Sequence, residues 1–358
     1  MENINIQNTQ ENIQITKEET GKKENKKLYF YIKILILIIY VAIIVSTEIT
    51  YRKKLFDKSI EYQEDIREKY EKKSAFYSCW KFFSVLGTLY VCLGIYFIIF
   101  IFFPLNYSFC AMQSLNLSNY TTNILKMIYR NARPYWKSDI LDIVCNSGYG
   151  NPSGHSLVCL SFFLTISHIL TNFNFFRTTL KGKILRIVIF CFFISLAFLV
   201  IISRVLVAAH SINQVIYGSL LGISIYFIPI HIFSYHTYSS EKFIEHMYNI
   251  KNFVIYIIVY ISLVILLIII YFSISDDEDI EHLIYKKVFN GKKCDFKYKF
   301  QLLKNDGFTQ ALAITSMIGA HLGLFLLIYI LKKLKFVRTC ERVKKKDKLT
   351  NECPEGLP

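Results

Sequence analysis

Long apolar blocks separated by short polar stretches dominate the chain. The first is LYFYIKILILIIYVAIIVST at residues 28–47, and clear blocks follow at about 80–103, 154–173, 184–202, 212–235, 252–274 and 308–332. Each is close to the roughly 20 residues that a helix needs to cross a bilayer. Because hydrophobic residues also make up 53% of the chain, the pattern predicts an all-α fold, a polytopic integral membrane helical bundle.

Residues 105–128 are the ambiguous segment. They contain five amide side chains, Asn106, Gln113, Asn116, Asn119 and Asn123, too many for a helix that faces lipid on all sides. The segment is either a span that faces the bundle interior or a re-entrant loop. Counted as a span, it gives about eight spans and puts both termini on one side of the membrane.

The segments outside the bundle complete the domain organisation. Residues 1–28, rich in Glu, Lys, Asn and Gln, are predicted to be a disordered cytoplasmic tail. Residues 29–50 are predicted to be an N-terminal signal-anchor helix, because no small-residue cleavage site follows the apolar block. Residues 51–335 would form the membrane-embedded domain, opening with a charged surface helix over 51–79, and 336–358 a basic cytoplasmic tail.

The net charge of +15 does not indicate nucleic-acid binding. Basic residues cluster beside apolar blocks, at 177–183 and 331–348, which is typical of cytoplasmic anchoring against the lipid bilayer. With the C-terminal tail cytoplasmic, residues 129–153 and 203–211 fall together on the opposite face. The nine cysteines are an odd number without CxxC spacing, so neither a metal site nor a complete disulfide framework follows.

Two motifs with candidate chemistry lie in residues 126–155. In KMIYRNARP, Lys126 and Arg133 would lie two turns apart if one helix continued through both; two cations snorkelling at a helix end are the alternative. In YGNPSGHSLV, Ser153 can cap a helix, Gly154 allows close backbone approach, and His155 falls in the first turn. Exposed amides there would form an anion site, although a routine cap with an interfacial histidine is equally open.

The third motif is SRVLVAAHSINQ, with Arg204, His210 and Gln214. An arginine at the end of an apolar helix is costly unless an anion or carboxylate pairs with it; alone, the motif reads as an interface boundary. Together the three motifs supply three cations, helix-start amides and two histidines on one face. That set suits phosphoryl transfer without a metal or cofactor, in which cations stabilise the phosphoryl oxygens and histidines act as nucleophile and acid.

The order Lys-x6-Arg-Pro, Pro-Ser-Gly-His and Ser-Arg-x5-His resembles the type 2 phosphatidic acid phosphatase and haloperoxidase superfamily. The resemblance implies a six-helix phosphatase core within residues 51–335. It implies His210 as the nucleophile that forms phosphohistidine and His155 as the general acid. Lys126, Arg133, Ser153, Gly154 and Arg204 would bind the phosphate.

One position departs from the superfamily pattern: Gln214 stands where an aspartate usually orients the nucleophile. Its carbonyl can accept the Nδ1 proton but carries no charge to stabilise imidazolium, so reduced activity is open. The AAH-x3-Gln, RPYW and C-x-x-G-x-G elements resemble glucose-6-phosphatases most closely, and Trp136 of RPYW could stack on a sugar or lie at the membrane interface.

The expected substrate is therefore a phosphorylated sugar, glucose 6-phosphate first, or alternatively a lipid phosphate such as phosphatidic acid or a sphingoid-base phosphate. The site would face the endoplasmic reticulum lumen, or the exterior if the protein resides in the plasma membrane. A catalytically weak membrane scaffold of the same fold is the further alternative.

Overall fold

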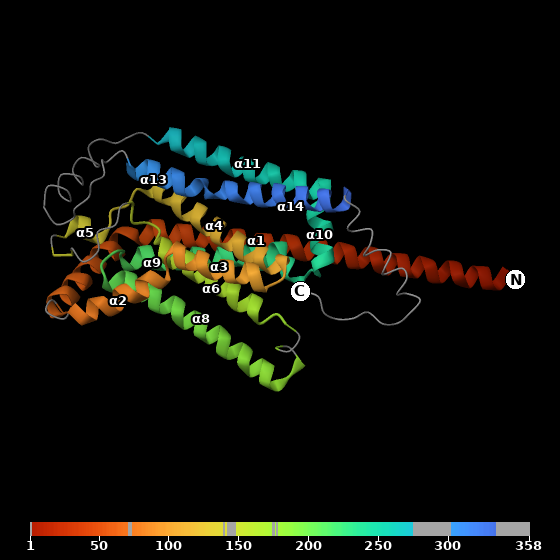
Figure 1. Cartoon of the computed structure of the whole chain (residues 1–358), viewed down its shortest axis with the longest axis horizontal. Helices are drawn as coiled ribbons and strands as arrows, with labels where there is room; N and C mark the ends of the chain where they lie inside the picture. The colour runs from red at the N-terminus through yellow and green to blue at the C-terminus, as the bar shows by residue number, and fades with distance from the viewer. Residues whose placement is uncertain are drawn as a thin grey trace.

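Helices make up the regular structure of every part of the chain that the computed structural model describes, which comprises residues 2–70, 74–138, 140–141, 148–173, 176, 178–274 and 302–333. The α-helices are α1 (Glu2–Tyr70), α2 (Ser74–Leu86), α3 (Leu89–Phe102), α4 (Leu105–Tyr129), α5 (Pro134–Lys137), α6 (Gly154–Leu170), α8 (Leu180–Leu206), α9 (Ile212–Phe227), α10 (Ser240–Tyr248), α11 (Ile250–Ser273), α13 (Leu302–Ala311) and α14 (Thr315–Lys333). A π-helix, η1 (Ile228–Phe233), and two 3₁₀ turns, η2 (Tyr235–Thr237) and η3 (Leu312–Ile314), complete the set. The predicted all-helical membrane bundle is confirmed (Figure 1).

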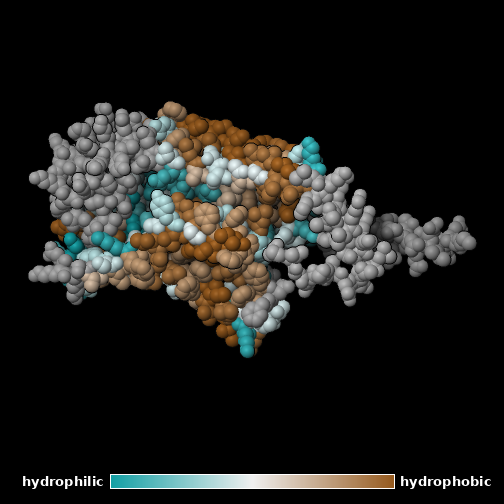
Figure 2. Space-filling view, in the orientation of Figure 1, coloured by the Kyte–Doolittle hydropathy of each residue, from teal (hydrophilic) through white to brown (hydrophobic). Residues whose placement is uncertain are grey.

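Five helices in the described residues are long and apolar enough to span a membrane, or six if a bent pair forms one span. Figure 2 shows hydrophobic residues covering the outward faces of α8 and α11, as expected for helices that contact lipid. The shorter α6 is apolar but has 17 residues, and α4 is too polar to qualify. The count of eight therefore remains a prediction.

The α4 helix settles the structure of the ambiguous segment. It is one continuous helix of 25 residues and not a re-entrant loop, and fourteen of its residues are buried. Among them, Asn106 donates from Nδ2 to the carbonyl oxygen of Tyr238 at 3.0 Å, and the hydroxyls of Ser118 and Ser161 lie 2.5 Å apart. Neighbouring elements thus satisfy some of these polar side chains inside the bundle, while Ser114 and Thr122 have buried hydroxyls without a hydrogen-bond partner among the described residues.

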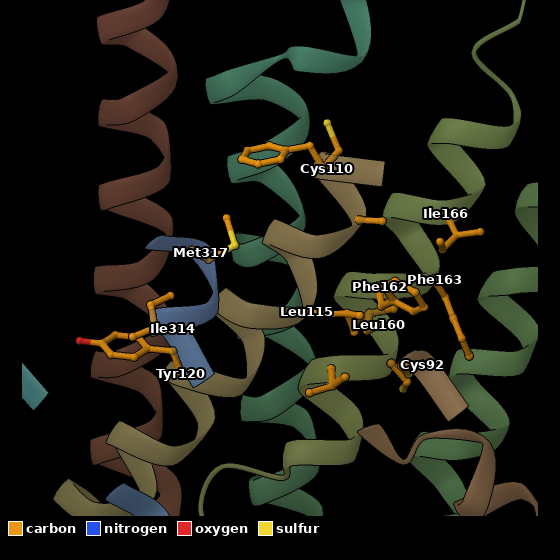
Figure 3. Close-up of a cluster of buried hydrophobic side chains, with 14 of the residues drawn as sticks. Cys92, Cys110, Leu115, Tyr120, Leu160, Phe162, Phe163, Ile166, Ile314 and Met317 are labelled. Atoms are coloured by element: carbon orange, nitrogen blue, oxygen red, sulfur yellow. The ribbon is translucent and has the colours of Figure 1, made fainter. Parts of the chain in front are cut away.

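At the centre of the bundle, α6 packs against α4, α8 and α9. Figure 3 shows part of the resulting core, in which Leu115 of α4 lies near Leu160 and Phe162 of α6. Cys92 and Cys110 are buried in the same cluster, which agrees with a packing role for cysteines in apolar blocks.

One helix, α1, covers the segments predicted as a disordered tail, an anchor and a surface helix. The prediction of disorder for residues 1–28 differs from the structure, which is helical from Glu2. The stretch has no proline and is rich in Glu, Lys and Gln, and extending an existing helix needs no new nucleation. Beyond residue 50 the helix packs one side against the bundle, where Ser59 and Gln63 are buried, while most of its other side chains are exposed or half-buried.

The predicted span 80–103 is divided between α2 and α3, which meet at an angle of 46°. Gly87 and Thr88 separate the two helices, and the Thr88 hydroxyl donates to the Val85 carbonyl at 2.7 Å. Apolar composition alone could not reveal this break, since glycine and threonine are both common inside membrane helices.

Candidate active site

Four helix ends meet at one end of the bundle and bring the three sequence motifs together. The end of α4 supplies Lys126, the start of α6 supplies His155, the end of α8 supplies Arg204, and His210 precedes α9. The described residues of 129–153 therefore lie at the same end as residues 203–211, as the charge pattern predicts. The end of α6 and the η2 turn lie at the other end of the bundle, where Nε2 of His168 and Nε2 of His236 are 3.2 Å apart.

The ring of His210 is held at both nitrogens. Nε2 lies 3.2 Å from Nη1 of Arg133, and Nδ1 lies 2.8 Å from the carbonyl oxygen of Gly150. An arginine N–H can only donate, so Nε2 must be the acceptor and Nδ1 carries the proton. His210 is therefore the Nδ1–H tautomer, with its Nε2 lone pair directed to the cationic side of the site.

The surroundings of His210 favour its neutral form. Its side chain is 1% exposed. Burial lowers the pKa of His210 well below 6.5, and the positive charges of Arg133, Arg204 and Lys126 lower this pKa further. The structure thus brings the three predicted cations close enough to act on one imidazole.

Gln214 contacts Nδ1 of His210 from the position predicted to orient the ring, but the Gly150 carbonyl also contacts this nitrogen. Its Oε1 lies 3.3 Å from Nδ1 of His210, farther than the Gly150 carbonyl, and also accepts from the Ser211 amide at 3.2 Å. Its Nε2 donates to the Ala132 carbonyl at 2.8 Å. The side chain thus forms the capping box of α9 and ties that helix to the loop after α4.

Gly150 is required at its position by close packing. A Cβ atom there would lie 2.5 Å from Nε2 of Gln214 and 2.6 Å from the Ala132 carbonyl oxygen. The absence of a side chain lets the Gly150 carbonyl reach His210. The sequence analysis missed this backbone acceptor, although Gly150 directly precedes the second motif.

Arg133 reaches the site from a loop, which corrects the prediction of one helix through Lys126 and Arg133. The α4 helix ends at Tyr129, and Arg130 adopts a left-handed conformation with φ of 46°. Arg133 then precedes α5, and its guanidinium donates to the carbonyls of Gly148 at 2.7 Å and Ala209 at 3.0 Å. These bonds connect the loop of the first motif to the segments that lead into the second and third motifs.

Arg204 is buried with part of its donor set open. Its Nη1 donates to the hydroxyl of Ser84 on α2, a partner that the sequence analysis missed. Its Nε is buried and meets no hydrogen-bond acceptor among the described residues. A buried guanidinium donor without an acceptor is costly, so this N–H is well suited to donate to an anionic oxygen of a ligand.

The second motif forms the start of α6, with one departure from prediction. Ser153 is the N-cap residue, but its side chain makes no cap hydrogen bond; its hydroxyl oxygen accepts from Ser156 at 2.9 Å. The Ser153 amide donates to the Gln214 carbonyl at 3.0 Å, so it is not available to an anion. The next amide, that of Gly154, is at the first helical position, where no intrahelical acceptor exists.

Gly154 also leaves space beside a cation. A Cβ atom at this residue would lie 3.7 Å from Nζ of Lys126 and 3.0 Å from Cγ2 of Thr122. A side chain here would therefore press on the Thr122 methyl group and lie in van der Waals contact with the ammonium group. The next residue, His155, lies beside the bend between α2 and α3, with Cδ2 3.4 Å from where a Cβ of Gly87 would be.

The tryptophan of RPYW is buried in an aromatic cluster. Trp136 is 7% exposed and lies in a cluster with Tyr135, Tyr149, Leu141 and Ala208. Its ring contacts Tyr135 and Tyr149 edge to face, with centroids 6.3 and 6.4 Å apart. Neither an interfacial position nor a stacking platform for sugar fits this burial, so the role of Trp136 is to support the loop.

Comparison with known proteins agrees with the motif order. Residues 105–238 match the family model described as PAP2 superfamily. A crystal structure of a transmembrane PAP2-type phosphatidylglycerolphosphate phosphatase from Bacillus subtilis is similar, with 18% identity and a TM-score of 0.43, over 56% of this chain and 94% of that one. Among curated proteins, none matches the chain.

Proposed function

Because this integral membrane protein carries a PAP2 superfamily domain in residues 105–238, we propose that it is a phosphatase that hydrolyses a phosphate monoester through a phosphohistidine on His210. The observation that carries the proposal is the tautomer of His210. Its Nδ1 proton is directed to the Gly150 carbonyl, and its Nε2 lone pair lies beside the Arg133 cation. A neutral imidazole whose Nε2 lone pair accepts from Arg133 can attack phosphorus once a bound phosphoryl group takes over that arginine donor.

The cations and the start of α6 would hold the phosphoryl group. Arg133 lies beside Nε2 of His210, the nitrogen that would bond to phosphorus. The Nε of Arg204, which has no acceptor among the described residues, supplies a second donor. Lys126 adds a charge next to Gly154, whose amide is free of an intrahelical acceptor. The Ser153 hydroxyl accepts from Ser156 and keeps its own O–H to donate. Fixed positive charges of this kind stabilise the oxygens of the transition state without a metal ion or cofactor.

The reaction would take place in two steps. In the first, Nε2 of His210 attacks phosphorus, the bond from phosphorus to the ester oxygen breaks, and protonated His155 gives its proton to the leaving alcohol. In the second, His155 takes a proton from water as the water oxygen attacks phosphorus. The bond from Nε2 to phosphorus then breaks, which releases inorganic phosphate and restores both histidines.

Two substrate classes follow from different observations. The AAH-x3-Gln arrangement, with Gln214 in contact with Nδ1 of His210, supports a sugar phosphate such as glucose 6-phosphate. The burial of Trp136 removes one expected sugar contact and favours the alternative of a lipid phosphate. For either substrate we place the site on the membrane face opposite the basic C-terminal tail, in the lumen of the endoplasmic reticulum or outside the cell.

The test is phosphate release by the purified full chain from glucose 6-phosphate and from phosphatidic acid, in chelator. We expect release from one of them and inhibition by vanadate, which mimics five-coordinate phosphorus. Activity abolished by chelator and restored by magnesium would contradict the mechanism. A wild-type chain that is inert on both esters would favour the scaffold alternative.

A further inference from the structure

The buried side of α1 is mostly polar, and most of its polar residues follow the predicted anchor segment. Four residues of this helix are buried among those with described side chains: Ile44, Glu48, Ser59 and Gln63. At 100° per residue, the three polar ones fall within about 60° of each other around the helix. They form a stripe that we call the polar stripe of α1.

Gln63 closes the turn that carries His210. Its side chain is 3% exposed, and Nε2 donates to two carbonyl oxygens, that of Val205 at 2.9 Å and that of His210 at 2.8 Å. The first belongs to the last turn of α8, where carbonyls have no partner within the helix. One amide group from α1 therefore fixes the backbone on both sides of the turn.

The other members of the stripe hold the neighbouring segments. The Ser59 hydroxyl oxygen accepts from the amide of Ile212, the first residue of α9, at 2.9 Å. The Glu48 carboxylate accepts from Nδ2 of Asn151 at 2.7 Å and of Asn213 at 3.3 Å. It thereby joins the second motif to α9, one residue before Gln214.

We propose that α1 is a positioning element of the active site: its polar stripe, chiefly through Gln63, sets the orientation of the His210 backbone. This inference rests on the proposed function for His210. The stripe lies outside residues 105–238. A helix that precedes the family domain therefore helps to position residues within it. The His210 ring is restrained from within the domain and its carbonyl from α1.

Gln63→Glu tests this role with little change in volume, because a carboxylate cannot donate to the two carbonyls. Gln63→Met removes the donor without adding charge and serves if the first variant fails to fold. Glu61→Gln, on an exposed residue of the same turn, is the matched control. We expect kcat to fall about tenfold in both Gln63 variants, the effect of about one lost hydrogen bond, with KM within about threefold of wild type.

A second measurement does not depend on turnover. Diethyl pyrocarbonate modifies accessible neutral imidazoles, and peptide mass spectrometry gives the rate at each histidine. We expect His210 to react several-fold faster in the Gln63 variants than in wild type or Glu61→Gln, because the turn opens more often. Unchanged kcat and unchanged His210 reactivity would overturn the positioning role. A wild type without phosphatase activity would instead refute the proposed function, and the modification rates would still decide whether α1 holds the turn.

Discussion

At the residue scale, the partners of His210 determine what its imidazole can do. Nδ1 faces a neutral carbonyl, that of Gly150, and a neutral amide, that of Gln214. Neither stabilises imidazolium as a carboxylate would, and the arginine at Nε2 opposes protonation. The ring is thus kept neutral to low pH, which suits the nucleophile that we propose.

The two histidines should differ in a labelling experiment. His210→Ala is expected to abolish covalent phosphate trapping from ³²P-labelled substrate after acid quench, since no other group replaces Nε2. His155→Ala should still be labelled by p-nitrophenyl phosphate, whose leaving group needs no proton, but not by an alkyl phosphate. Label retained by His210→Ala would show that the nucleophile is another residue.

Gln214→Glu should change the pH dependence. A carboxylate beside Nδ1 favours imidazolium and raises the pKa of His210. Because the neutral form is the nucleophile, activity is lost as pH falls through this pKa. The acid limb of kcat/KM, expected below pH 6.5 in wild type, should move to higher pH. The variant should also lose about 1–3 kcal/mol of stability because the Ala132 carbonyl loses its donor. An acid limb that does not move would rule out His210 as the titrating group.

At the scale of elements, the bend between α2 and α3 positions part of the site. Ser84, before the bend, accepts from Arg204, and Gly87, at the bend, lies beside His155. A Cβ atom at Gly87 would overlap Cγ1 of Val200 on α8. The bend can approach α8 this closely only because Gly87 has no side chain.

Gly87→Ala should therefore displace the bend. We expect a loss of about 1–3 kcal/mol in stability, typical of overpacking, and a higher KM as Ser84 shifts from Arg204. Gly94→Ala is the matched control, because a Cβ at Gly94 meets nothing within 4 Å and alanine in a helix gains about 0.5–1 kcal/mol. Thermal unfolding in detergent and steady-state kinetics compare the two, and equal behaviour would refute the role of the bend.

The elements also show what the sequence could and could not predict. Long apolar runs predicted α8, α11 and α14, because lipid selects for uniform apolar composition. The motifs predicted which residues gather around His210, since each carries its chemistry locally. The Gln63 contacts were missed because the residue lies in a charged run where only tertiary packing distinguishes a buried glutamine from an exposed one. The Ser84 contact and the bend were missed because both lie in an apolar run whose composition is that of an unbroken span.

At the scale of the whole molecule, apolar side chains lie on the outside and many polar side chains lie inside, the reverse of a water-soluble protein. Apolar side chains cover α8 and α11 on the outside (Figure 2), while amides and hydroxyls of α4 lie inside and the buried cations gather at one end. The motifs are carried by α4, α6, α8 and α9, and α6 is in contact with the other three. Their geometry therefore requires that α4 crosses the membrane beside α6, inside the bundle. The topology of α4 is therefore a test of the arrangement.

The α4 helix contains three glycosylation sequons, NYS at Asn106, NLS at Asn116 and NYT at Asn119. Their side-chain amides are hydrogen-bonded within the protein: Asn106 donates to Tyr238, Asn116 to Met112 and Asn119 to Gln310. A helix packed in this way cannot present asparagine to the lumenal enzyme, so we expect no mobility shift with glycosidase.

A positive control comes from the loop that carries the first motif. The double substitution Lys137→Asn with Asp139→Thr places a sequon at residue 137, whose side chain is exposed, in the segment predicted to be lumenal. That variant should gain a glycan, and the wild type none. A shift in wild type that is lost when Asn106, Asn116 and Asn119 are mutated would mean that α4 is exposed to the lumen and does not cross the membrane inside the bundle. A double variant without glycan would instead place the His210 end of the bundle on the cytoplasmic face, and the substrate would then have to be reached from the cytosol.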